Sequence, residues 1–211
     1  RFEPFFTDTH RHEFDVRIGV GPILFYDPVG RVVVTLQPDR TYEKVVVDAW
    51  RRVAFDRNDT VAPDGGHPEH TGDPRTDPDT AGYVQRWFAT RPDDWQTWWQ
   101  RRDGVAGAEG QAAVRAAVHT NTPTSEHLDV LGRPFLTVRR NRLQRDGPVD
   151  EVPNRVELDI EDNQRAVRDA LVPGGRTVLR QDHDLAGGLV RTRGMDTGRR
   201  WMLNDVGGRP V

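Results

Sequence analysis

One four-residue pattern, Asp-x-x-Gly, returns along this 211-residue chain and limits the folds that it can adopt. Its copies begin at Asp27, Asp129, Asp184 and Asp205 and reach glycine at Gly30, Gly132, Gly187 and Gly208. Tyr26 precedes the first copy, and arginine follows three copies, at Arg31, Arg133 and Arg209. Aspartate at the first position of a turn accepts hydrogen bonds from backbone N–H groups ahead of it, and glycine at the fourth adopts positive φ without a Cβ clash. Each copy therefore predicts a tight turn between two strands.

The spacing of these aspartates suggests a repeated unit. The step from Asp184 to Asp205 is 21 residues, and so is the step from Asp27 to Asp48. A period of about 20 residues holds two strands and two turns, because a strand advances roughly 3.3 Å per residue. Similarity at a fixed period is the signature of a repeat architecture, and the sequence therefore predicts repeated β-hairpins.

Composition divides the chain into five parts. We expect an extended connector at 1–22, the first hairpins at 23–56, a mobile loop rich in Pro, Gly and Asp at 57–78, a helical insert at 79–119, and further hairpins at 120–211. The predicted fold class is mainly β, with antiparallel hairpins and a short helical insert.

The expected strands follow from apolar and alternating runs. In the first block they lie at Ile23–Tyr26, Arg31–Leu36, Tyr42–Val47 and Arg51–Phe55. Later, Val156, Leu158 and Ile160 alternate with acidic residues, which is the period of two of a sheet with one wet face. Two prolines predict a longer hairpin loop at 144–154.

Helical spacing predicts three short helices in the insert, of which the last spans 108–118. The second would carry Trp95, Trp98 and Trp99 at positions i, i+3 and i+4. Aromatic stripes with this spacing usually face a core, so we expect at least two of these tryptophans to be mostly buried against the sheet. A row of exposed indoles would instead be a platform for stacking sugars, and this alternative stays open.

Three groups of histidine or aspartate are candidate metal ligands. His10 and His12 share one side of an extended segment, but zinc needs three or four ligands and no third is near in sequence. His67 and His70 are three apart around a proline, whereas the helical zinc motif needs a spacing of four. An acidic run that could attract a cation, without the pattern of a calcium loop, is formed by Asp73, Asp77 and Asp79. We therefore predict neither a metal nor a cofactor.

Other functional classes are disfavoured by composition. Ser125 is the only serine and no nucleophile-elbow or phosphate-loop motif occurs, so a serine hydrolase is not expected. The absence of cysteine excludes disulfides and thiolate metal sites. A net charge of −3 disfavours nucleic-acid binding, and no run of about 18 apolar residues predicts a membrane span.

Longer phrases around the turns resemble a known family. In order, Pro22–Asp27, Trp50–Arg52, His127–Val138 and Arg200–Val206 are similar to the RHS or YD-repeat region of the B component of bacterial Tc insecticidal toxins. The resemblance implies a segment of a curved β-shell that encloses and shields a toxic polypeptide, with no catalytic role. The site residues would then be those of the repeat turns themselves.

The same resemblance implies partners and a location. The partners would be the remainder of the shell in the same or a partner chain, the enclosed effector polypeptide, and a pore-forming toxin component. The protein would be secreted after synthesis in the bacterial cytoplasm, and we expect the chain to be a piece of a longer one. Two alternatives stay open: a carbohydrate-binding β module, and an ADP-ribosyltransferase-type toxin enzyme, whose Glu-x-Glu pair is missing.

Overall fold

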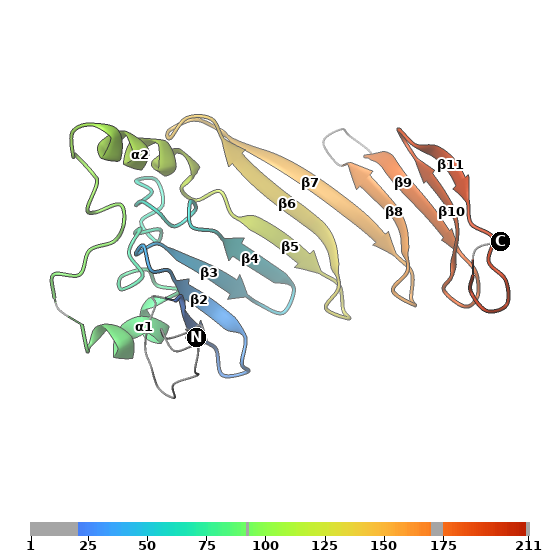
Figure 1. The fold of residues 1–211 in the computed structure, drawn as a ribbon, viewed down its shortest axis with the longest axis horizontal. Helices are drawn as coiled ribbons and strands as arrows, with labels where there is room; N and C mark the ends of the chain where they lie inside the picture. Colours follow the sequence, from blue (N-terminus) through green and yellow to red (C-terminus); the bar gives the residue numbers. More distant parts are fainter. Residues whose placement is uncertain (1–20, 92, 170–174, 210–211) are drawn as a thin grey trace, which may run out of the picture. The chain divides into compact units, whose positions relative to one another are not determined.

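The computed structural model describes residues 21–91, 93–169 and 175–209, which are mainly β (Figure 1). The strands of these residues are β1 (Ile23–Tyr26), β2 (Val32–Leu36), β3 (Tyr42–Val47), β4 (Arg51–Phe55), β5 (Thr124–Leu128), β6 (Pro134–Arg142), β7 (Val149–Leu158), β8 (Gln164–Asp169), β9 (Arg176–His183), β10 (Leu189–Gly194) and β11 (Gly198–Trp201). They form one sheet in which the strands follow their order along the chain. Antiparallel hairpins pair β1 with β2, β5 with β6, β7 with β8, and β9 with β10. The predicted fold class is confirmed.

The first block of strands was predicted closely. β1, β3 and β4 have the expected bounds, and β2 begins one residue later. The apolar residues of β2 and β3 account for this agreement, because Val34, Leu36 and Tyr42 are buried. Local sequence pattern and burial therefore point to the same strands here.

Two predictions in the later strands were wrong. The loop expected at 144–154 is shorter, because β7 begins at Val149, and Glu151 already forms an ion pair with Arg140 of β6 at 2.9 Å. Ile160 does not continue the alternation of β7. The strand ends before it, and Ile160 is exposed in a turn.

The insert contains α1 (Ala81–Phe88), α2 (Ala108–Ala116) and the 3-10 turn η1 (Ala117–His119). The helix expected to carry the three tryptophans does not form, and this prediction was wrong. The N–H of Thr97 donates to Gln100 Oε1 at 2.9 Å, while the N–H of Gln100 donates to Thr97 Oγ1 at 3.1 Å. These reciprocal bonds have the pattern of a capping box, which can begin a helix, but only turns follow it in this segment.

The three tryptophans nevertheless pack against apolar clusters. Trp95 lies against a core cluster formed by Val33, Val34, Leu36, Tyr42 and Val84. Trp98 and Trp99 lie against a second cluster formed by Val61, Ala62 and Ala117. All three indoles are partly buried, but only Trp95 packs against a cluster that contains strand residues, whereas the cluster beside Trp98 and Trp99 lies outside the strands.

Residues 57–78 contain no helix or strand, as predicted, but their longest exposed stretch is 65–69 and other parts of the segment are buried. Thr60, Asp73 and Asp77 are buried. The backbone is hydrogen-bonded as well, since the N–H of Asp77 donates to the carbonyl of Asp73 at 2.9 Å. This burial argues against the mobility that was expected from the prolines.

The chain divides into two compact units. Unit 1 consists of residues 1–46, 53–123 and 141–149, and unit 2 of residues 47–52, 124–140 and 150–211. Both core clusters belong to unit 1. Among the described hydrophobic residues of unit 2, only Val138 and Ala166 are buried.

Some predictions concern residues that the structure does not describe. The connector at 1–22 lies almost entirely in that part of the chain, and so do His10 and His12. In the described part, no helix is both long and apolar enough to span a membrane.

Candidate functional site

The Asp-x-x-Gly copies share one backbone geometry. In the turns that begin at Asp27, Asp129, Asp184 and Asp205, the N–H of the aspartate donates to the carbonyl of the fifth residue at 2.8–2.9 Å. The N–H of the fourth residue donates back to the aspartate carbonyl at 2.9–3.1 Å. The fourth residues have φ values of 86° at Gly30, 76° at Gly132, 80° at Gly187 and 74° at Gly208. The predicted positive φ is confirmed at all four positions.

The aspartate side chain closes each of these turns. Its Oδ1 atom accepts the N–H groups of the third and fifth residues at 2.8–3.0 Å. In two copies the fifth residue also donates through its side chain, with Arg31 Nε 2.6 Å from Asp27 and Arg133 Nε 2.8 Å from Asp129. Arg209 contributes its backbone N–H. Tyr26, which precedes the first turn, is exposed.

In two of these turns the bonds stabilise the ionised form of the aspartate. The side-chain and backbone hydrogen bonds of Arg133 lower the pKa of Asp129. Desolvation would raise the pKa of Asp27, but the bonds from Arg31 outweigh it and lower that pKa as well. Each turn is thus a locally satisfied unit, and the turns at Asp27, Asp129 and Asp184 each join two strands.

Two further turns have the same backbone geometry, although neither has the Asp-x-x-Gly pattern. In the turn from Asp159 to Asn163, Asp162 has a φ of 70° where the other copies have glycine. Asn163 Nδ2 replaces arginine and donates to Asp159 at 3.1 Å. In the second, from Gln37 to Thr41, it is Arg40 that has a φ of 71°. The signal available for the first was Asp at the first position and Asn at the fifth.

Asp48 begins a different turn. Its N–H donates to Arg51, the fourth residue instead of the fifth, at 2.9 Å, and its Oδ1 accepts the N–H of Trp50. The 21-residue step from Asp27 therefore joins two kinds of turn. The common element of the repeat is the hairpin, while the length of its turn varies.

In unit 2 the five-residue turns expose apolar side chains. The turns after β5, β7 and β9 join hairpins of a sheet whose strands follow chain order, so these turns lie along one edge of the unit. Their second residues, Val130, Ile160 and Leu185, are 82%, 89% and 103% exposed. Turn positions usually carry small polar residues, so this choice is not explained by the turn geometry.

A buried lysine forms a second cluster, which belongs to unit 1. Lys44 Nζ lies 2.8 Å from Asp77 and 2.7 Å from Asp79, with both Lys44 and Asp77 only 1% exposed. Tyr42 donates its hydroxyl to Asp77 at 2.8 Å, and burial raises the pKa of that hydroxyl. The ammonium also lies 4.6 Å from the ring centre of Phe55. The loop that carries Asp77 and Asp79 is thereby attached to β3.

The lysine cluster explains part of the acidic run. The acidic run suggested Asp77 and Asp79 as possible ligands of a free cation, and the cation beside them is the ammonium of Lys44. Lys44 is the only lysine of the chain, which was the one signal that could have drawn attention to it. In the described part of the chain, no group of three or more histidine or acidic side chains is arranged to hold a metal ion.

Asp59 joins the two ends of the long connection between β4 and β5, and both ends belong to unit 1. Its Oδ1 atom accepts the N–H of Thr122 at 3.1 Å and the hydroxyl of Thr122 at 2.9 Å. Its carbonyl accepts the N–H of Asn121 at 2.9 Å. Burial is the main reason that the pKa of Asp59 rises to about 6. The connection from β4 to β5 is therefore closed at its base by one carboxyl group.

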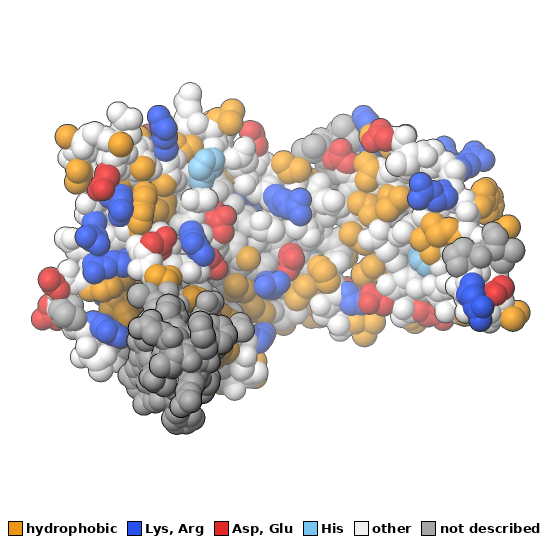
Figure 2. Space-filling view, viewed as in Figure 1, with side chains coloured by type: hydrophobic (Ala, Val, Ile, Leu, Met, Phe, Trp, Pro, Cys, Tyr) orange, Lys and Arg blue, Asp and Glu red, His pale blue; other side chains and the backbone are white. Residues whose placement is uncertain are grey.

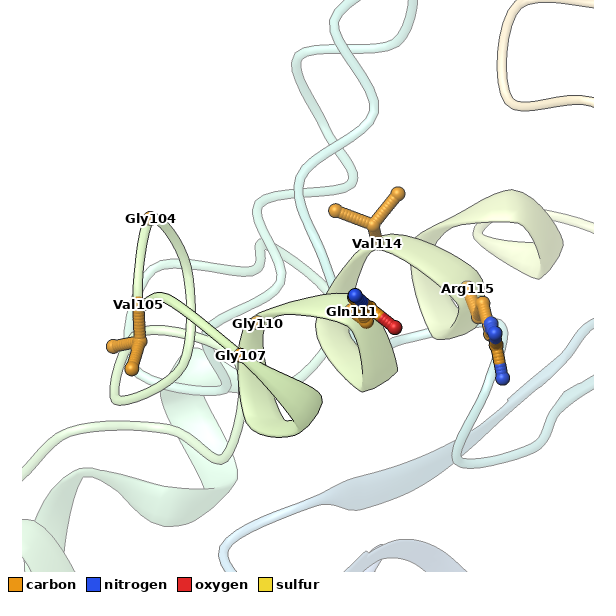
Figure 3. Close-up of a pocket in the computed structure, with 7 residues that line it drawn as sticks. All are labelled: Gly104, Val105, Gly107, Gly110, Gln111, Val114 and Arg115. Carbon is orange, nitrogen blue, oxygen red and sulfur yellow. The ribbon is translucent and has the colours of Figure 1, made fainter.

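A small open cavity of about 430 Å³ lies beside α2 (Figure 3). Its lining consists of Gly104, Val105, Gly107, Gly110, Gln111, Val114 and Arg115. This set offers one cation and one amide but no nucleophile with an adjacent base. The cavity therefore has no arrangement suited to covalent or acid–base catalysis.

Comparison with known proteins identifies solved structures with a similar fold. No family model matches the chain, and no curated protein matches its sequence. A structure of a Photorhabdus luminescens Tc holotoxin pore matches with a TM-score of 0.60 and 19% identity, over 90% of this chain. The chain has the fold of a segment of Tc toxin chains.

Two crystal structures agree with this likeness. TcdB2-TccC3 matches with a TM-score of 0.60 and 19% identity, and TcdB2-TccC3-Cdc42 with 0.61 and 18%, each over 90% of this chain. In all three structures the chain spans 7% of the length of the protein that it matches. The shared fold extends over nearly all of this chain but over a small part of those proteins.

Proposed function

We propose that this chain is a structural segment of an RHS-type repeat shell in a Tc-like toxin. Its role would be to build part of a wall that encloses and shields a toxic effector polypeptide. The observation that carries the proposal is the agreement in fold with Tc toxin chains over 90% of the chain. At 19% identity this agreement concerns the backbone, so the role in the shell is our inference.

The arrangement of the hairpins supports this role. A wall needs a sheet that can be extended strand by strand, and a sheet with strands in chain order meets this need. It also needs turns that close without help from distant residues, which the aspartate turns provide. The role requires no catalytic residue and no cofactor, and we propose that this segment acts without either.

The partners of such a segment follow from the role. We propose that it contacts the remainder of the shell, in the same or a partner chain, and the enclosed effector polypeptide. A pore-forming toxin component would receive the effector, and the assembled toxin would be secreted. In this role the residues of the repeat turns act as structural elements of the wall. These residues are Tyr26, Asp27, Gly30, Arg31, Asp129, Gly132, Arg133, Asp184, Gly187, Asp205, Gly208 and Arg209.

The carbohydrate-binding alternative has no observation in its favour. A sugar platform needs a row of exposed aromatic faces. Here Trp95, Trp98 and Trp99 pack against the apolar clusters of unit 1. The tryptophans are thus accounted for as part of the core.

Protection of a polypeptide against protease tests the proposed function. The longer protein that contains this segment would be produced together with its downstream polypeptide and exposed to protease under native conditions. We expect the downstream polypeptide to survive much longer than the same polypeptide produced alone. Digestion at equal rates in the two preparations would rule out a shielding shell.

A further inference from the structure

Three arginines face one another across the last strands of unit 2. The register pairs Arg180 of β9 with Arg193 of β10, and Arg193 with Arg199 of β11. Residues that are directly opposite in an antiparallel pair point to the same face, with Cβ atoms about 5 Å apart. We call these three side chains the arginine row. Figure 2 shows basic side chains at the surface of the part formed by β9–β11.

The arginine row is exposed and has little compensating charge. All three residues are exposed. Asp182 lies 3.8 Å from Arg180, and within the described ranges Arg193 and Arg199 form no ion pair. Like charges directly opposite one another destabilise a sheet, so the row lowers the stability of the chain by itself.

Two other arginines of the same sheet do have acidic partners. Arg168 forms an ion pair with Glu157 at 2.6 Å. Arg191 forms one with Asp182 and lies 5.1 Å from the ring centre of Trp201. This contrast shows that the sheet has room for compensating groups, yet lacks them along the arginine row.

Trp201 borders the row and adds a second type of contact. It is paired with Arg191 in the register, two residues along β11 from Arg199, and is 63% exposed. Arginine and tryptophan are the residue types most enriched where binding energy is concentrated in protein interfaces. Together, the row and Trp201 form a cationic surface with an apolar border.

We propose that the arginine row and Trp201 bind an acidic segment of a polypeptide. Guanidinium groups bind carboxylates through two parallel hydrogen bonds, and three of them in a row favour several carboxylates on one side of the segment. The row spans only about 10 Å, twice the distance between neighbouring strands. Nucleic acid is less suited, because the chain as a whole carries a net charge of −3 and would repel a longer phosphate backbone. This binding does not require a shell and is independent of the proposed function.

Binding of fluorescent decaglutamate to the 211-residue chain, followed by anisotropy, tests the proposal. Arg193→Glu removes the centre of the row, and Arg139→Glu is a matched control. Arg139 is also an exposed strand residue of unit 2, and its replacement changes the net charge equally. We expect Arg193→Glu to weaken binding about tenfold or more. Arg139→Glu should weaken it less than about threefold, because salt screens distant charges. Circular dichroism confirms that both variants fold.

Stability gives a second readout that does not depend on the probe. Arg193→Glu places a carboxylate between two arginines, so its unfolding transition should shift to higher denaturant concentration, and that of Arg139→Glu should not. Equal weakening of binding by both variants would overturn the proposal. So would an absence of decaglutamate binding by the unmodified chain, or tighter binding of a ten-nucleotide oligothymidylate.

Discussion

Units 1 and 2 are built from the same kind of hairpin, but among the described residues only those of unit 1 form buried apolar clusters. In unit 1, α1 joins β2 and β3 in one buried apolar cluster, and the segment 57–78 joins η1 in a second. In unit 2 the described hairpins bury two hydrophobic residues and expose apolar side chains at their turns. Hairpins without a covering layer are marginally stable. The turn therefore specifies the hairpin, whereas the covering layer decides whether a block of hairpins is stable by itself.

The largest effect is expected from Lys44→Met, which removes the cation of the buried cluster in unit 1. Asp77 would be left buried without its partner, and breaking a buried ion pair in this way costs about 3–5 kcal/mol. The loss is measured by urea denaturation. Arg57→Met is the matched control, because Arg57 and Glu43 form an exposed pair at 2.9 Å that should contribute below about 1 kcal/mol. Equal losses in the two variants would contradict the cluster's role.

Trp98→Ala and Trp50→Ala compare the two units directly. Trp98 packs against the second apolar cluster of unit 1, whereas Trp50 belongs to unit 2 and is 59% exposed. Truncating Trp98 should cost about 3 kcal/mol, and truncating Trp50 less than about 1 kcal/mol. Denaturation measures both, and glycan binding should be unaffected by either. If Trp98→Ala leaves stability unchanged but removes binding to a glycan, the sugar platform replaces our interpretation.

Asp59, whose carboxyl group accepts the hydrogen bonds of Thr122, should contribute more to the stability of unit 1 at low pH. The folded pKa of about 6 lies above the unfolded value of about 3.9, so the folded state binds more protons between these pH values. The stability that Asp59 contributes is therefore full below about pH 4 and falls by about 3 kcal/mol as the pH rises through 6. Asp73, whose pKa is lowered against desolvation by its bonds with Arg75, acts in the opposite direction.

Asp59→Asn isolates this effect. Urea denaturation at pH 4.5 and at pH 6.5 gives the change in stability for the unmodified chain and for the variant. We expect the unmodified chain to lose more stability between pH 4.5 and pH 6.5 than the variant does. The difference between these two losses is the contribution of Asp59. A difference of zero, or one of opposite sign, would contradict the assigned pKa.

The smallest effect is expected at a repeat turn of unit 2. Gly132→Val forces a β-branched residue to a φ of 76°, although no atom lies within 4 Å of the added Cβ. The cost should be about 1–2 kcal/mol from backbone strain alone. Gly82→Ala in α1 also meets no atom within 4 Å, but its φ is not positive and it should stabilise the chain by about 1 kcal/mol. If denaturation shows that the two substitutions lower the free energy of unfolding equally, strain at the turn is not the cause.

Sequence predicted the parts of the fold that depend on neighbours along the chain. The strand at Tyr42–Val47 and the positive φ of Gly132 follow from local pattern and turn chemistry. The prediction of a helix around Trp98 was wrong because the spacing of the tryptophans does not reveal the contacts that this segment makes with distant residues. The N–H of Trp98 donates to the carbonyl of Arg40 at 3.2 Å, and Thr97 with Gln100 closes a single turn.

The candidate sites follow the same division. The aspartate turns were visible in sequence, except where Asp162 takes the place of glycine. Lys44 and Asp77 are 33 residues apart, and Asp59 and Thr122 are 63 apart. No local rule relates such residues, since the fold alone brings them together. The arginine row likewise requires the register of three strands.

Hydrogen exchange of the 211-residue chain tests the central claim, that unit 1 is stable by itself and unit 2 depends on neighbours. We expect amides of β2, β3 and the buried part of 57–78 to exchange about 100-fold or more slowly than those of β9–β11. Mass spectrometry of peptides from the two units measures this ratio in one sample. Equal protection of β9–β11 and β2–β3 would contradict the claim, because unit 2 would then hold its hairpins without any covering layer.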